Sequence, residues 1–286
     1  MARRKKKTSK YEIYAGLLIL LVFAIVGLVR YCREKPAPEL PQNPDFRIQF
    51  IDVGQADAAL IFCEGETMLI DGGNVGDGDT IYTVLKKHGL TSLDYVVCTH
   101  AHEDHVGGLS SALTACSAET VLCPVKSYDS QAFRNFAKRA GKISVPKAGD
   151  RFDLGGAQVQ ILSCDPHAEE TNDTSIVLKI VYGETSFLFT GDAEYLTEAT
   201  MLEAGYDLSA TVLKVGHHGS STSTSYRFLN AVMPQYAVIS VGKDNSYGHP
   251  HDEVLSRLRD ADVTVLRTDE RGDIICESDG KTVTFN

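Results

Sequence analysis

The stretch "THAHEDHVGG", residues 99–108, holds three of the chain's nine histidines within six positions. Buried polar groups cost free energy unless they are hydrogen-bonded or bind something. Histidine nitrogen and carboxylate oxygen are donors that suit zinc, manganese and iron. In extended backbone His100 and His102 point to the same side, because side chains alternate along a strand. Asp104 and His105 cannot follow that alternation, so we expect them to turn at the start of a helix toward a second metal ion.

Three further strand-like runs end in a candidate ligand. They are "TMLIDGG" (67–73) with Asp71, "TSFLFTGD" (185–192) with Asp192, and "SATVLKVGHHG" (209–219) with His217 and His218. Glycines beside Asp71 let the backbone bend close to a site. This arrangement is expected when strand ends converge on one cleft.

Two of these assignments have alternatives. Asp192 precedes a predicted helix, where an aspartate is equally typical of an N-cap, and only the neighbouring histidine cluster favours a ligand role. Strand alternation places His217 on the same face as Leu213 and Val215. It therefore favours His217 as the ligand and His218 as a residue lining the cleft, with the reverse order left open.

Beyond residue 45, short strand patterns alternate with amphipathic helix patterns. The strand-like runs 46–53, 58–64 and 67–73 indicate an antiparallel meander. Helices are predicted at 79–89, 106–116, 129–141, 193–205, 225–233 and 251–261. Two strand-rich halves with helices between them predict an α/β fold: two sheets packed face to face and covered outside by helices.

The N-terminal part differs in composition from the rest. We expect a basic cytoplasmic segment (1–12), a transmembrane anchor (13–31), a proline-rich linker (32–45) and a globular domain (46–286). Residues 13–29 are 17 nearly uncharged residues, and no small-residue cleavage site follows them. The basic block lies before the anchor, so the positive-inside tendency predicts a single-pass protein of the cell membrane with an extracellular globular domain.

The globular domain is acidic. Residues 45–286 contain 19 Lys and Arg against 35 Asp and Glu, a formal charge of −16. Tight, unaided binding of nucleic acid depends on basic side chains that neutralise phosphates. The charge therefore argues against such binding, and bound metal cations would offset it only locally.

The ligand candidates occur in the order and approximate spacing of the metallo-β-lactamase superfamily. Within that superfamily, "FIDVGQADAALI", "LIDGG", "TNDTSIVLKI", "FLFTGDAE", "LKVGHHGSSTS" and "SVGKDNSYGHP" resemble the metallo-hydrolase domain of the ComEC/Rec2-type competence proteins. The resemblance runs from about Phe46 to the C-terminus. It implies an αββα sandwich of two mixed sheets, a dinuclear metal site and hydrolysis, with phosphodiesters in nucleic acid as the expected substrate.

The resemblance also implies roles for individual residues. One metal ion is expected on His100, His102 and Asp173, the other on Asp104, His105 and His217, with Asp192 bridging the two. The superfamily usually has another histidine before the bridging aspartate. His167 is the one histidine in that interval, but the family pattern places "NDTS" there and favours Asp173 or Asn172. The metals are expected to be two divalent ions, zinc first and manganese as the alternative.

The remaining assignments concern catalysis and substrate. Catalytic roles are expected for Asp71, Asp104 and His249, and substrate contacts for His218, Ser220, Lys243 and His249. His249 is nearly as well explained as a loop residue before a helix, and a lone surface lysine such as Lys243 is usually only solvated.

The metal-ligand pattern and the N-terminal segment predict a membrane-anchored hydrolase that uses a metal-activated hydroxide. The resemblance implies that the hydroxide attacks a phosphodiester, with DNA as the expected partner. One alternative is hydrolysis of an envelope or small-molecule ester, such as a choline phosphodiester or a lactone. Another is a non-catalytic, metal-stabilised binding module, although seven candidate donors exceed the four that close a structural zinc site. The competence proteins carry this domain on a multi-helix membrane channel, whereas one anchor is predicted here, so DNA uptake is not implied. No protein partner follows from the sequence.

Overall fold

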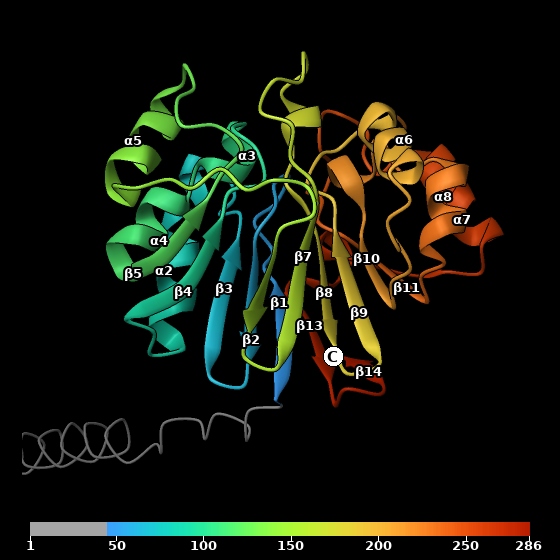
Figure 1. The fold of residues 1–286 in the computed structure, drawn as a ribbon, viewed down its shortest axis with the longest axis horizontal. Coiled ribbons are helices and arrows are strands. Elements are labelled where there is room, and N and C mark those ends of the chain that lie inside the picture. Colours follow the sequence, from blue (N-terminus) through green and yellow to red (C-terminus); the bar gives the residue numbers. More distant parts are fainter. Residues whose placement is uncertain (1–44) are drawn as a thin grey trace, which may run out of the picture. The chain divides into compact units, whose positions relative to one another are not determined.

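Two mixed seven-stranded β-sheets form the centre of the computed structural model, which describes residues 45–286. The first sheet has the order β14-β13-β1-β2-β3-β4-β5 and the second the order β12-β11-β10-β9-β8-β7-β6 (Figure 1). The strands of the first sheet are β1 (Phe46–Phe50), β2 (Ala59–Cys63), β3 (Glu66–Ile70), β4 (Ser92–Val97), β5 (Ser117–Leu122), β13 (Ile274–Ser278) and β14 (Val283–Phe285). Those of the second are β6 (Arg151–Leu154), β7 (Ala157–Ser163), β8 (Val177–Tyr182), β9 (Thr185–Phe189), β10 (Val212–Lys214), β11 (Tyr236–Ile239) and β12 (Thr264–Arg267).

Each sheet combines an antiparallel part with a parallel part. Strands β1, β2 and β3 form the predicted antiparallel meander, and β3, β4 and β5 are parallel. In the second sheet β6 to β9 are antiparallel, and β9, β10, β11 and β12 run parallel. Parallel neighbours have their carboxyl ends at the same edge of a sheet, so the segments after β3 and β4, and those after β9 and β10, emerge side by side.

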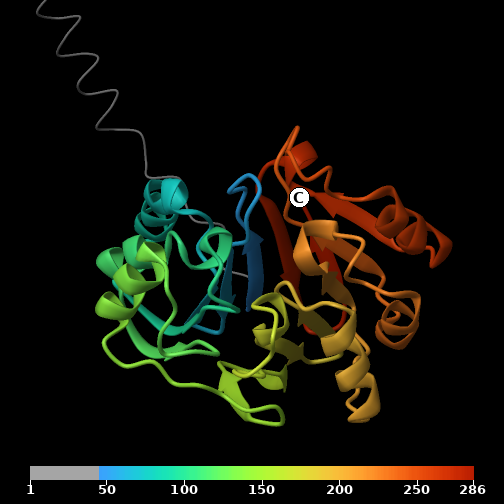
Figure 2. The same ribbon diagram turned by 90° about the horizontal axis from the view of Figure 1, so that it is seen from above.

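Helices cover the outer face of each sheet, which gives the predicted αββα layering (Figures 1 and 2). On the first sheet they are α2 (Gly78–Lys87), α3 (Glu103–Val106), α4 (Leu109–Ala115) and α5 (Gln131–Ala140). On the second they are α6 (Tyr195–Glu203), α7 (Tyr226–Val232) and α8 (Asp252–Asp260). Short turns complete the chain: η1 (Val75–Asp77), η2 (Asn172–Thr174), η3 (Gly216–Gly219) and α9 (Thr268–Arg271).

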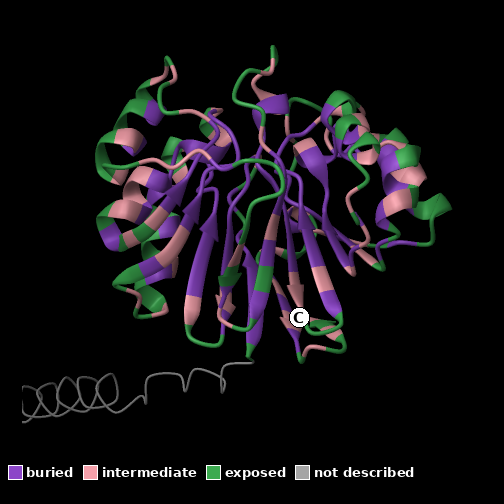
Figure 3. Ribbon diagram, viewed as in Figure 1, coloured by how far each residue is buried: buried purple, intermediate pink, exposed green. Residues whose placement is uncertain are grey.

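The main hydrophobic core lies between the two sheets. Phe46 of β1 stacks on Phe187 of β9, with 4.7 Å between ring centroids, and Phe50 stacks on Phe189 at 5.8 Å. Figure 3 shows the central strands almost wholly buried. A fully buried side chain of this size contributes about 1.5–3 kcal/mol relative to an exposed one. Two further apolar clusters hold the outer helices against their sheets, so the strand ends that carry polar residues are fixed from both sides.

The first strand of this part of the chain pairs with a strand close to the C-terminus. Strand β1 pairs along its whole length with β13, and Phe46 lies opposite Ser278. At the other end of this sheet, residues 142–146 contribute a single bridge, between Leu122 and Ser144.

The predicted cytoplasmic segment, transmembrane anchor and most of the linker, residues 1–44, lie outside the described residues. None of the helices within residues 45–286 is long and apolar enough to cross a bilayer.

Candidate metal centre

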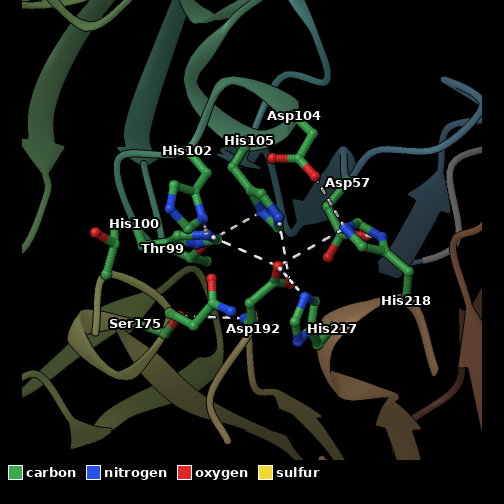
Figure 4. A network of polar contacts seen from close by, with 12 residues as sticks. Asp57, Thr99, His100, His102, Asp104, His105, Ser175, Asp192, His217 and His218 are labelled. Atoms are coloured by element: carbon green, nitrogen blue, oxygen red, sulfur yellow. Dashed lines mark hydrogen bonds and ion pairs between the residues drawn. The ribbon is translucent and has the colours of Figure 1, made fainter. Parts of the chain in front are cut away.

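The loop after β4 carries the histidine cluster. His102 has extended backbone and forms the N-cap of α3, so the chain passes from strand to helix within this loop. The Nε2 atom of His100 lies 3.1 Å from Nδ1 of His102, which places both imidazoles on one side. Asp104 and His105 occupy the first turn of α3 and face the same region (Figure 4).

Asp192, just after β9, lies at the centre of these side chains (Figure 4). Its carboxylate is 3.2 Å from Nε2 of His105 and 3.8 Å from Nε2 of His100. It also lies 3.8 Å from Nε2 of His217 and of His218. Asp192 does not cap the following helix, because Glu194 is the N-cap of α6.

Asp71 fixes the orientation of His105 from behind. Its Oδ2 atom lies 2.8 Å from Nδ1 of His105, and its two oxygens also accept hydrogen bonds from the amide and hydroxyl of Thr99. The Nδ1–H of His105 can donate to Asp71, which leaves Nε2 as the ring nitrogen that faces Asp192. The backbone comes close here: a Cβ on Gly72 would lie 2.7 Å from the amide nitrogen of Leu109. Only glycine avoids that contact.

His217 and His218 lie on different sides of Asp192. Nε2 of the buried His218 is 3.4 Å from Asp104, and its Nδ1 is 3.0 Å from the Ser240 carbonyl oxygen, so Nδ1–H can donate there. His217 is partly exposed, and its Nδ1 lies 3.1 Å from Glu194. Strand β10 ends at Lys214, and both histidines have left-handed backbone with φ near +50°. Strand alternation therefore does not apply to them, and the reason given for preferring His217 was wrong.

Asp57 and Lys214 form a buried ion pair beneath His218 that sequence reasoning missed. Lys214 Nζ lies 2.7 Å from Asp57 Oδ2, and Asp57 Oδ1 lies 3.2 Å from Nδ1 of His218. The available signal was Lys214 itself, the one charged residue in the apolar run "TVLKVG". A lysine inside such a strand requires a buried partner.

The charges of the cluster act strongly on one another. Burial lowers the pKa of His105, but Asp192 and Asp71 outweigh burial and hold that pKa well above its ordinary value. Burial likewise opposes protonation of His218, yet Asp192 and Asp57 raise its pKa to about 10. Burial raises the pKa of Asp192, but His105 and His218 bring it well below the usual range. The carboxylates thus require positive charge here, which protons or a bound cation can supply.

The donor set fits divalent metal ions. One ligand atom each from Asp104, His105, Asp192 and His218 lies within 4.8 Å of the others. Among residues 45–286, the buried His105 Nε2, His218 Nε2 and Asp192 Oδ1 have no hydrogen-bond partner. Buried polar atoms that converge without hydrogen-bond partners are expected where a metal binds. A second group, Asp57, Asp71 and His105, also has suitable spacing, but Lys214 and Thr99 already contact its carboxylates.

We call six residues the histidine–carboxylate cluster: His100, His102, Asp104, His105, Asp192 and His218. Part of it lines an open cavity of about 350 Å³, which is also lined by Gln55, Glu103, Asn172, His217, Tyr247 and His249. Tyr247 and His249 belong to residues 242–250, which we call the rim loop.

Other predicted site residues lie elsewhere. Asp173 is buried, and its Oδ1 accepts hydrogen bonds from the Glu194 amide and the Thr197 hydroxyl, so it supports the start of α6 and not the cluster. Lys243 is exposed and lines a neighbouring hollow. Ser220 is buried, and its Oγ lies 3.0 Å from the Thr222 hydroxyl oxygen. His167 is exposed on its loop.

Comparisons with known proteins agree with this architecture. Residues 51–243 match the model of the metallo-beta-lactamase superfamily. ComE operon protein 3 of Bacillus subtilis is 29% identical over all of this chain and 38% of its own length. Competence protein ComA of Neisseria gonorrhoeae is 31% identical over 91% of this chain and 37% of its own length. The chain thus spans less than half of these relatives. The metallo-beta-lactamase fold protein YhfI from Bacillus subtilis has the same fold, with a TM-score of 0.52 and 13% identity over 77% of this chain and 95% of YhfI.

Proposed function

The chain belongs to the metallo-β-lactamase superfamily of metal-dependent hydrolases, and from that premise we propose that it hydrolyses phosphodiester bonds in DNA. The observation that carries the proposal is the convergence of the histidine–carboxylate cluster on one open cavity. Similarity to competence proteins supports a nucleic-acid substrate.

We propose two metal positions that share Asp192. His100 and His102 would hold one ion, and Asp104, His105 and His218 the other. Zinc is the first expectation and manganese the alternative, because histidine and carboxylate donors accept both. When bound, such ions would lower the pKa of a water molecule and so supply a hydroxide nucleophile near neutral pH.

The protein's own groups would orient the reaction. Asp71 holds the His105 ring through its Nδ1, and the Ser240 carbonyl oxygen holds His218 in the same way. Such partners fix the tautomer and direction of a metal ligand. His249 and Asn172 line the cavity within reach of a bound substrate. We further propose that residues 13–31 anchor the domain to the cell membrane, with the site outside.

A second candidate, hydrolysis of a small ester, is favoured by the formal charge of −16 on residues 45–286. A small substrate needs no basic track for a polyphosphate backbone.

One experiment separates the two. The full-length chain is purified in detergent, its metal content is measured by elemental analysis, and zinc or manganese is restored. Single-stranded DNA and bis-p-nitrophenyl phosphate are then assayed side by side. Two bound metals with DNA cleavage support the proposal. Turnover of the small diester alone would favour a small ester as the substrate. One tightly held metal without turnover would contradict both candidate functions.

A further inference from the structure

The rim loop carries an exposed aromatic ring at the mouth of the cavity. Tyr247 is 67% exposed, yet it lines the same cavity as Asp192 and His218. Within residues 45–286 its phenol oxygen makes no hydrogen bond. Packing in the hydrophobic core therefore does not require a tyrosine at this position. The Tyr247 ring is exposed to solvent beside the candidate metal positions.

The ring continues a series that leads outward from the histidine–carboxylate cluster. The imidazole of His249 lies 23° from parallel to that of His218, with 6.5 Å between centroids. The Tyr247 ring in turn lies 24° from parallel to His249, at 5.6 Å. Three rings, each close to parallel with the next, thus lead from a metal ligand candidate to the surface, and the outermost one is largely exposed.

The rim loop is fixed by hydrogen bonds. The amide group of Asn245 donates to the carbonyl oxygens of Gly242 and His249, and its Oδ1 accepts from the backbone amides of Tyr247 and His249. Gln55 ties this loop to the opposite sheet, because its Oε1 accepts from the Gly242 amide and its Nε2 lies 3.3 Å from His249 Nδ1. A loop whose backbone is held in place before binding loses little conformational entropy on binding.

The charge of the domain limits how a polynucleotide could be held. Glu103 and Asp104 also line the cavity, and residues 45–286 carry a formal charge of −16. Attraction between basic side chains and phosphates is therefore weak here. Stacking of a base on an aromatic ring does not depend on charge and tolerates any base, but it requires an unpaired base whose face is accessible.

We infer that Tyr247, backed by His249, is a stacking subsite for one nucleobase of single-stranded nucleic acid, positioned to bring an adjacent phosphodiester to the cluster. The inference rests on the proposed phosphodiesterase function and narrows its substrate to unpaired strands. It also explains how an acidic domain could hold a nucleic acid.

The test uses the full-length chain and its Tyr247→Ala and Tyr247→Phe variants. Binding is measured by fluorescence anisotropy with metal chelated, using a 12-residue thymidine oligonucleotide and an abasic oligonucleotide of equal length. Loss of one stacked base is expected to weaken binding by roughly 5- to 150-fold. Tyr247→Ala should show this loss on the thymidine oligonucleotide only, whereas Tyr247→Phe should bind like wild type. A 2-aminopurine base in the oligonucleotide should be quenched by wild type and not by Tyr247→Ala.

Control experiments distinguish failure of this inference from failure of the proposed phosphodiesterase function. Tyr82→Ala removes another exposed tyrosine, on α2 and away from the cavity, and should leave binding unchanged. Metal-restored wild type and Tyr82→Ala should hydrolyse methyl p-nitrophenyl phosphate, which tests the cluster without a nucleobase. If wild type hydrolyses this diester and Tyr247→Ala binds the thymidine oligonucleotide as tightly as wild type, the stacking subsite is overturned and the phosphodiesterase proposal stands. If wild type does not distinguish the thymidine from the abasic oligonucleotide, the subsite is also overturned. If wild type hydrolyses neither DNA nor the small diester, the proposed function itself fails.

Discussion

The histidine–carboxylate cluster and the rim loop face the same cavity but place similar residue types in opposite environments. His105 and Asp192 are almost wholly buried and contact several charged groups each. His249 is only partly buried, and Tyr247 is exposed. A buried charge is costly unless it has partners, whereas an exposed side chain can be changed without that cost. Metal binding, stability and activity should therefore be coupled in the cluster, whereas changes in the rim loop should affect substrate binding alone.

The strongest test of this difference is Asp192→Ala. Asp192 lies within 4 Å of four histidine rings, so its removal should release bound metal. Activity should fall by about 10²- to 10³-fold or more. Metal content by elemental analysis and DNA hydrolysis check both effects. The matched control is Asp129→Ala, a fully exposed carboxylate paired with Arg134. A variant that retained both metals and wild-type activity would remove Asp192 from the site.

The ion pair beneath the cluster offers a test of stability. Lys214→Met leaves the buried Asp57 without its lysine partner and with only His218 beside it, and should lower the free energy of unfolding by about 3–5 kcal/mol. Lys179→Met is the matched control, because Lys179 is similarly buried but its partner Asp207 is 76% exposed. Its loss should be about 1 kcal/mol or less. Urea unfolding of the two variants measures the difference, and the double variant Asp57→Asn/Lys214→Met should recover part of the loss. Equal losses for both lysines would show that burial does not set the strength of these pairs.

A smaller effect is expected from Asp71→Asn. The amide keeps the shape of the side chain but is a poorer acceptor for the Nδ1–H of His105. Removing such a partner of a metal ligand typically costs about 10- to 100-fold in affinity or activity. We expect activity to fall more than metal content, as measured by hydrolysis and elemental analysis of the same sample. Loss of metal in proportion to activity would indicate that Asp71 itself binds the ion.

The rim loop should give the smallest change. His249→Gln removes one polar contact with Gln55 and one with a bound substrate, and should raise KM by roughly 3- to 10-fold. Metal content and urea unfolding should match wild type, since His249 is partly exposed and lies outside the cluster. Loss of metal in this variant would contradict the proposal that metal binding depends on the histidine–carboxylate cluster and not on the rim loop.

Much of this arrangement could be predicted from the sequence because local patterns specify it. Apolar and polar residues alternate in strands such as β7 (AQVQILS), and the spacing of His100, His102, Asp104 and His105 matches a strand that passes into a helix. The layered fold followed from the same patterns, and family membership is confirmed by the matched model.

The parts that could not be predicted depend on backbone and tertiary contacts. His217 and His218 both have left-handed backbone, so strand alternation does not apply to them, and nothing in "VGHHG" indicates this conformation. Asp173 was assigned from a family pattern, but its tertiary partner is the start of α6. The pairing of Asp57 with Lys214 joins residues 157 positions apart, which no local pattern reveals.

The pairing of β1 with β13 bears on how the protein is made. During synthesis from the N-terminus, β1 and β2 leave the ribosome early, but the other edge of β1 has no partner until residues 274–278 follow. Contacts of such sequence separation form slowly, and unpaired strand edges favour aggregation meanwhile. Completion of the first sheet therefore waits for nearly the whole chain, and a ribosome stalled before β13 would hold a nascent chain with an open strand edge.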